Sequence, residues 1–197
     1  MLKKILPGLA AILAALLLAV AINTLRQGSR QIDVPPVQPL AFDENAAAQR
    51  LAAAVRLRTI SFDGQSAASA AEFRKLHALL KKSFPRAHAA LKRETVNELS
   101  LLYAWPGSDP AAKPVMLMAH QDVVPIAPGT ERDWQVDPFA GEIRDGFVWG
   151  RGAWDDKANL FAIFEAIETL AASGFRPRQT LYIASGHDEE VGGEQGA

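Results

Sequence analysis

The sequence predicts an α/β fold, in which a mixed sheet is flanked by helices and preceded by an apolar helix. Two observations carry this prediction. The hydrophobic pattern changes from a helical period in the first half of the chain to short apolar runs, typical of strands, in the second half. A further helical pattern then separates two of those runs, and alternating strands and helices are typical of layered α/β proteins.

Length and composition narrow the class of protein. The chain has 197 residues, enough for one domain with a hydrophobic core. Its formal net charge is −1 and its basic residues form no stripe, so nothing indicates a nucleic-acid partner. The sequence contains no cysteine. Disulfides and thiolate metal sites are therefore excluded, and any metal must be held by His, Asp or Glu.

The N-terminus carries an apolar segment. Lys3 and Lys4 precede an uncharged run over residues 5–25, which at about 20 residues is long enough to cross a bilayer as a helix. We expect residues 1–30 to be an uncleaved signal-anchor, giving a single-pass membrane protein whose remaining chain is exported to the periplasm or the extracellular space. The alternative is a signal peptide, cleaved at the small-residue sequence Ala19-Val20-Ala21 and followed by secretion. A buried core helix fits less well, because every face of the run is apolar.

A proline-rich linker over residues 31–42 is expected to lead into a domain over residues 43–197. The expected helices are 44–58, with Asp43 as N-cap, 69–83 and 157–173, and the expected strands are 99–105, 115–119, 147–149 and 180–184. Strand 115–119 is a continuous apolar run, so we expect it to be buried on both faces.

Three polar clusters come at the ends of these elements. His120 and Asp122 follow strand 115–119, Asp155 and Asp156 precede helix 157–173, and a His-Asp-Glu-Glu run over 187–190 follows strand 180–184. Ligands of open α/β sheets bind at the carboxyl ends of strands. Each cluster alone has a simpler interpretation: a histidine satisfied in a turn, an N-cap, or a solvated acidic turn.

Taken together, the clusters favour a divalent metal site. Histidine, aspartate and glutamate are suitable ligands for Zn²⁺. A metal hydrolase also needs a carboxylate that is not a ligand, which takes a proton from the attacking water and passes it to the leaving amine. The neighbouring pair Glu189 and Glu190 can divide the two tasks of general base and metal ligand.

These motifs resemble a known family. The matching segments are Ala-His-Gln-Asp-Val-Val-Pro at 119–125, Trp134 with Pro-Phe-Ala-Gly at 138–141, Asp-Gly-Phe-Val-Trp-Gly-Arg-Gly at 145–152, Asp-Asp-Lys at 155–157 and Gly-His-Asp-Glu-Glu at 186–190. In this order they resemble the di-zinc peptidases that include aminoacylase, carboxypeptidase S, glutamate carboxypeptidase and acetylornithine deacetylase. The sequence of residues 186–193 is most similar to that of the carboxypeptidase S-like branch.

The resemblance implies a zinc-exopeptidase-like catalytic domain with two Zn²⁺ ions, although Co²⁺ or Mn²⁺ could use the same ligands. It implies that His120 binds one zinc, Glu190 binds the other, and Asp155 bridges both, with a cis peptide bond after Asp155. Asp122 would orient His120, and Glu189 would be the general base.

The function implied is hydrolysis of amide or peptide bonds adjacent to a free carboxylate, as in a carboxypeptidase or an N-acyl-amino-acid hydrolase. The expected substrates are small peptides or N-acyl amino acids. The alternative is a non-catalytic, membrane-anchored binding module of the same fold. A His-Glu-x-x-His motif, the commonest other zinc signature, does not occur in the chain.

The resemblance also implies parts that the sequence does not contain. The family uses another acidic ligand shortly after the Glu-Glu pair, a histidine much later, and a second domain that makes homodimer contacts and recognises part of the substrate. We therefore expect these 197 residues to be the N-terminal part of the catalytic domain, supplying two of the three ligands of each zinc. Alone they are expected to bind zinc weakly and to hydrolyse little.

Overall fold

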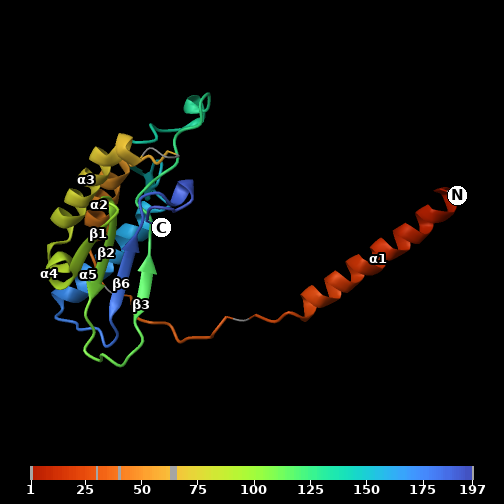
Figure 1. Ribbon diagram of the computed structural model, residues 1–197, viewed down its shortest axis with the longest axis horizontal. Coiled ribbons are helices and arrows are strands. Elements are labelled where there is room, and N and C mark those ends of the chain that lie inside the picture. The colour runs from red at the N-terminus through yellow and green to blue at the C-terminus, as the bar shows by residue number, and fades with distance from the viewer. Residues whose placement is uncertain (1, 30, 40, 63–65, 197) are drawn as a thin grey trace. The chain divides into compact units, whose positions relative to one another are not determined.

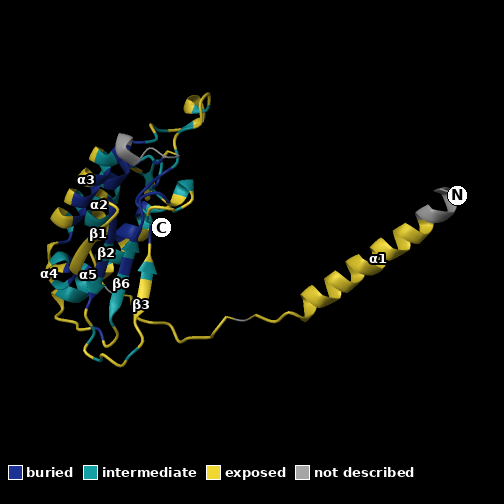
Figure 2. Cartoon of the chain, viewed as in Figure 1, coloured by how far each residue is buried: buried dark blue, intermediate teal, exposed yellow. Residues whose placement is uncertain are grey.

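The computed structural model describes residues 2–29, 31–39, 41–62 and 66–196, and it divides into two compact units at residue 40 (Figure 1). The first unit contains helix α1 (Leu2–Arg26). Its segment Pro7–Arg26 is long and apolar enough to cross a membrane, and its side chains are exposed in this unit (Figure 2).

The second unit is built on a four-stranded sheet with the order β1-β2-β6-β3. Its strands are β1 (Lys92–Val96), β2 (Ser100–Trp105), β3 (Val115–Met118) and β6 (Leu181–Ser185). Strand β1 pairs with β2 and β2 with β6 in antiparallel fashion, whereas β3 and β6 are parallel. A separate hairpin joins β4 (Glu142–Arg144) to β5 (Phe147–Trp149). The sheet is therefore mixed, as predicted.

Four helices pack against the sheet and against one another: α2 (Glu44–Val55), α3 (Ser66–Ser83), α4 (Pro85–Ala90) and α5 (Lys157–Ala172). Two short 3₁₀ helices, η1 (Glu131–Asp133) and η2 (Glu189–Val191), lie in the loops. The core contains Phe84 together with Phe161 and Phe164 of α5, and the face of β2 that carries Tyr103. Dark blue in Figure 2 marks this interior between helices and sheet. The expected α/β fold with helices flanking a mixed sheet is confirmed.

Two boundaries show how local chemistry sets the elements. The Asp43 carboxylate accepts a hydrogen bond from the Ala46 N–H at 2.9 Å, which is the expected N-cap of α2. Pro85 ends α3 as expected, but it also begins α4, because proline is well suited to the first turn of a helix, where its missing N–H has no partner to lose. Helix α4 and strands β1 and β4 were not predicted.

The expectation that strand 115–119 is buried on both faces is wrong. In the structure β3 is the edge strand of the sheet, and Met116 and Met118 are 54% and 58% exposed. The apolar run does form a strand, but an edge strand has a neighbour on one side only. The predicted helix 44–58 is also shorter, since α2 ends at Val55.

Candidate metal centre

The parallel pairing of β3 with β6 brings two of the polar clusters together. The hydrogen-bond ladder continues beyond the strands, from the Ala119 N–H to the Ala184 carbonyl at 3.1 Å and from the Gln121 N–H to the Gly186 carbonyl at 2.8 Å. His120 therefore lies beside the turn that follows β6, and that turn carries Glu189 and Glu190. The arrangement is the expected one for two strand ends at the same edge of a sheet.

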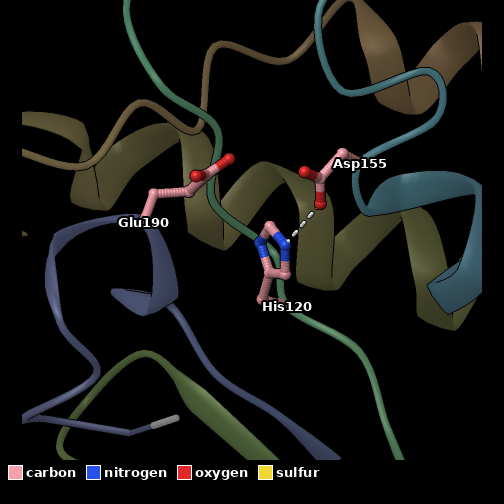
Figure 3. Close-up of side chains that lie close together, drawn as sticks. All are labelled: His120, Asp155 and Glu190. Atoms are coloured by element: carbon pink, nitrogen blue, oxygen red, sulfur yellow. Dashed lines mark hydrogen bonds and ion pairs between the residues drawn. The ribbon is translucent and has the colours of Figure 1, made fainter. Parts of the chain in front are cut away.

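Three candidate ligands converge at this edge (Figure 3). One donor atom from each of His120, Asp155 and Glu190 lies within 4.8 Å of the other two. The His120 Nε2 atom is 2.9 Å from Asp155 Oδ1. One imidazole nitrogen and two carboxylates form a donor set suited to Zn²⁺, so the residues present fit a divalent metal ion.

Asp122 connects the histidine to the acidic turn. Its buried carboxylate accepts a hydrogen bond from the Ser61 hydroxyl at 2.7 Å and from the backbone N–H groups of Glu189 and Glu190 at 3.2 and 3.1 Å. The same carboxylate lies 3.3 Å from His120 Nδ1, which also donates to the Asp122 backbone carbonyl at 3.1 Å. His120 Nε2 is left as the nitrogen available to a metal.

Asp156 has a role beyond helix capping. It occupies the N-cap position of α5, but its side chain makes no capping hydrogen bond. Its carboxylate instead accepts from the His120 backbone N–H at 3.1 Å. The simple N-cap interpretation of the Asp155–Asp156 pair therefore fails. The peptide bond between these two residues is cis, as the resemblance implied.

The charges of the site are strongly coupled. Burial by itself lowers the pKa of the His120 imidazole, but hydrogen bonds to Asp122 and Asp155 outweigh burial and raise that pKa to about 9. Burial acts in the opposite sense on Asp122, yet its hydrogen bonds with His120 and Ser61 hold the pKa of this carboxyl below its usual value. The pKa of Glu190 is raised, first by burial and then by the neighbouring carboxylates.

Glu189 lies beside the candidate ligands. Its Oε2 atom is 3.8 Å from His120 Nε2, and its side chain is 54% exposed, so water can reach the carboxylate. It borders a cavity of about 220 Å³. The other lining residues are Met118, Ala119, His120, Asp156, Ala184 and Gly186. The cavity wall combines apolar side chains with the carboxylates of Asp156 and Glu189. The cavity therefore suits a ligand that has both apolar and polar groups.

A buried network behind the site was missed by the sequence analysis. The Gln121 amide is fully buried and donates to the Leu99 and Ser185 carbonyls at 3.1 and 2.8 Å. Its oxygen bonds to His77 Nε2 at 2.7 Å. Because side chains alternate along extended chain, Gln121 points away from its neighbours His120 and Asp122 and into the core. His77 lies among the apolar positions of α3, and that placement could have identified it as a buried histidine.

The remaining histidines do not join the candidate ligands. His187 is 2% exposed and its Nδ1 atom forms a hydrogen bond of 2.6 Å with the Ser100 hydroxyl. His88 lies in α4, where Nδ1 donates to the Phe84 carbonyl at 2.9 Å. His77 contacts Gln121, as described above. Among the residues that the structure describes, His120 is thus the histidine found with two acids in one cluster.

The α/β sheet thus gathers acids and a histidine near the carboxyl ends of its parallel strands β3 and β6, an arrangement that can hold a metal ion. Residues 116–197 match the sequence profile of peptidase family M20/M25/M40. The chain belongs to this peptidase family, as the resemblance of its motifs implied.

Two curated proteins are similar to this chain in sequence over most of its length. The "Probable carboxypeptidase S-like 2" of Dictyostelium discoideum is 40% identical over 194 residues, which cover 94% of this chain and 37% of that protein. The mouse (Mus musculus) "N-fatty-acyl-amino acid synthase/hydrolase PM20D1" is 42% identical over 166 residues, covering 81% of this chain and 32% of that protein. The chain thus spans about a third of the length of these relatives.

The fold is also found among solved structures. Human carnosine dipeptidase 1 superposes with a TM-score of 0.61 at 22% sequence identity, over 77% of this chain and 33% of that one. At this identity the likeness concerns the fold alone. It agrees with the α/β architecture described above.

Proposed function

We propose that this chain is the N-terminal part of a zinc-dependent hydrolase that cleaves amide or peptide bonds adjacent to a free carboxylate. The observation that carries the proposal is the convergence of donor atoms from His120, Asp155 and Glu190 within 4.8 Å, with the Glu189 carboxylate beside them. Two relatives support the bond type, because their names specify a carboxypeptidase and a hydrolase of N-acyl amino acids. Both reactions break an amide next to a carboxylate.

In this proposal His120, Asp155 and Glu190 would hold the zinc. Bound zinc would supply Lewis-acid polarisation of the scissile carbonyl and a lowered pKa of water. Asp122 fixes the imidazole through Nδ1, and through the Glu189 and Glu190 N–H groups it fixes the acidic turn. The cavity beside Glu189 would receive the scissile amide of a small peptide or an N-acyl amino acid.

Glu189 is the proposed general base. Its exposed carboxylate accepts a proton from the attacking water as the water oxygen bonds to the carbonyl carbon. The protonated Glu189 then gives this proton to the amide nitrogen, the carbon–nitrogen bond breaks, and the amine leaves. The backbone N–H of Glu189, held by Asp122, sets the position of the side chain relative to His120.

The test is made in the full-length protein with a panel of N-acyl amino acids and dipeptides. Glu189→Gln is expected to lower turnover by roughly 10²–10⁴-fold, the usual contribution of a general acid–base group, while the zinc content measured by mass spectrometry is unchanged. Glu94→Gln, on the exposed strand β1, is the matched control and should leave turnover intact. His120→Ala should lower the zinc content itself.

The results separate the two functional hypotheses. If the wild-type protein turns over none of these substrates and Glu189→Gln changes nothing measurable, the hydrolase proposal fails and the non-catalytic binding module stands. Loss of turnover together with loss of zinc in Glu189→Gln would instead make Glu189 a ligand, contrary to the proposed role.

We also propose that α1 stays in the membrane as a single-pass signal-anchor, with the rest of the chain exported. Its length and uniform apolar exposure support this. Intact mass and N-terminal sequencing of the protein from membranes test it, since a mature N-terminus after Ala21 would mean a cleaved signal peptide. Homodimerisation through a second domain is part of the same proposal, and sedimentation of the full-length protein tests it.

A further inference from the structure

The end of the second unit that lies opposite the candidate metal centre is rich in basic side chains. Strands β3 and β6 begin at this end and β2 finishes there, since Val115 and Trp105 both pair with Leu181 (Figure 1). The metal centre lies beyond the other ends of β3 and β6. We refer to the surface formed by the last turn of α3, α4, the start of β1 and the loops before β3 and β6 as the basic end.

Six exposed basic side chains define the basic end, and none of them belongs to an ion pair among the described residues. They are Lys81, Lys82, Arg86, Lys92, Lys113 and Arg176. The acidic side chains nearby already have other partners. Asp109 pairs with Arg178 at 3.0 Å, and the Glu168 carboxylate accepts the backbone N–H groups of Arg86 and Ala87. The basic end therefore offers a surplus of free positive charge.

An exposed aromatic side chain accompanies these charges. Phe175 is 47% exposed and meets the Trp105 ring edge-on, with ring centroids 6.0 Å apart. A cavity of about 280 Å³ opens beside them, lined by Arg176 and Pro177 among others. Basic side chains around exposed aromatic residues are typical of surfaces that lie on the headgroups of a bilayer.

The connection to α1 enters the second unit at the same end. Helix α2 begins after Asp43, its Arg50 pairs with Glu165 of α5 at 2.6 Å, and Lys157 Nζ at the start of α5 donates to the Ala54 carbonyl near the end of α2. The two helices are therefore antiparallel, and the start of α2 lies beside the second half of α5. Residues 27–42 separate α1 from Asp43. An extended, proline-rich segment of this length reaches at most about 50 Å. A membrane that held α1 would therefore be present at high effective concentration for this surface.

We infer that the basic end docks on the anionic lipid headgroups of the membrane that holds α1, and that the metal centre then faces away from the bilayer. The inference rests on the proposed anchor. Its energetic basis is the attraction of unpaired Lys and Arg to a negatively charged surface, worth about a fivefold change in the docked-to-free ratio for each residue near the headgroups. Substrate then reaches the site from the aqueous side.

The experiment uses the full chain in lipid vesicles and a single fluorescent label. The sequence has no cysteine, so Ser108→Cys places one dye at the basic end and Ala127→Cys places one beyond the carboxyl end of β3. Both native residues are exposed. Energy transfer to a headgroup-bound acceptor is compared between phosphatidylcholine vesicles and vesicles containing one third phosphatidylserine. Flotation with the neutral vesicles reports the anchor separately.

We expect transfer from the Ser108→Cys dye to rise in the anionic vesicles and that from the Ala127→Cys dye not to rise. Raising the salt from about 0.1 to about 1 M, which shortens the screening length from about 10 Å to about 3 Å, should abolish the increase. Arg86→Glu with Arg176→Glu should lower the docked-to-free ratio at least about 25-fold. Arg74→Glu with Arg132→Glu, the same change in net charge elsewhere, should leave it near the wild-type value.

Each other outcome decides against the inference. If the chain floats with neutral vesicles but the Ser108→Cys signal is the same in both lipids, the docking is refuted and the anchor stands. Equal losses in the two double variants would show a nonspecific charge effect and also refute it. Failure to float with neutral vesicles would refute the anchor, and the docking with it. Circular dichroism of each variant shows whether the fold is retained.

Discussion

Replacing Asp122 by asparagine tests how much the Asp122 carboxylate stabilises the segments around the candidate metal centre. The Asp122 side chain is fully buried and contacts two other segments of the chain. Its Oδ2 atom accepts from the Ser61 hydroxyl and the Glu190 N–H, and its Oδ1 atom accepts from the Glu189 N–H. Asparagine has nearly the same shape but only one acceptor oxygen, so the substitution changes the hydrogen bonding without creating a cavity.

The expected loss of stability follows from these contacts. Whichever way the amide of the substituted side chain is turned, its NH₂ group faces a backbone N–H, either that of Glu189 or that of Glu190. A buried donor left without a partner costs about 1–3 kcal/mol. The remaining bonds lose the strength that an ionised acceptor gives them, roughly a further 1 kcal/mol in total. We therefore expect Asp122→Asn to lower the free energy of unfolding by about 3 kcal/mol.

Urea unfolding of the full chain in mild detergent, followed by circular dichroism at pH 7, measures this loss. Ser61→Ala removes a single hydrogen bond to the same carboxylate and should cost about 1 kcal/mol. Asp109→Asn is the matched control, because Asp109 pairs with an Arg178 that is 80% exposed, and such pairs contribute less than about 1 kcal/mol. A loss for Asp122→Asn no larger than that of Asp109→Asn would refute the reasoning.

Three further predictions concern acid, the core and metal. Burial lowers the pKa of His77, so the unfolded chain binds protons more readily and stability should fall as the pH drops below about 6.5; urea midpoints at pH 7.5 and 5.5 should differ less in His77→Gln than in the wild type. Phe84→Ala removes a fully buried ring that contacts Phe161 and Phe164 and should cost about 3–5 kcal/mol, against less than about 0.5 kcal/mol for the exposed Phe147→Ala; similar midpoints in the two variants would contradict this. Calorimetric titration of the 197-residue chain should show weak zinc binding, and a chelator should leave the unfolding midpoint unchanged, whereas tight uptake of two ions would oppose the prediction.

The elements that could be predicted from the sequence are those whose signals are local. The Asp43 cap, the amphipathic helices and the apolar strands each follow from spacing within one segment. Strand β1 has five exposed residues, so no alternation marks it. The exposure of β3 depends on which strand lies beside it, and a run of apolar residues carries no information about its neighbours.

The same difference between local sequence signals and long-range contacts is found at the candidate metal centre. The candidate ligands His120, Asp155 and Glu190 could be proposed because each follows a recognisable element and belongs to an ordered motif. The contacts that position them could not, because most of the donors that Asp122 binds are backbone N–H groups, which every residue except proline possesses. Ser61 likewise lies 61 positions away in the chain and belongs to no motif.

The contacts around the centre agree with the proposed hydrolase. The ladder between β3 and β6, the Asp122 carboxylate and the bond from the His120 N–H to Asp156 position the segments that carry the candidate ligands. The Glu189 and Asp155 side chains are more than half exposed, and Glu189 borders a cavity. Because these acids are open to water, a metal ion held between them would be able to meet both substrate and solvent, as hydrolysis requires.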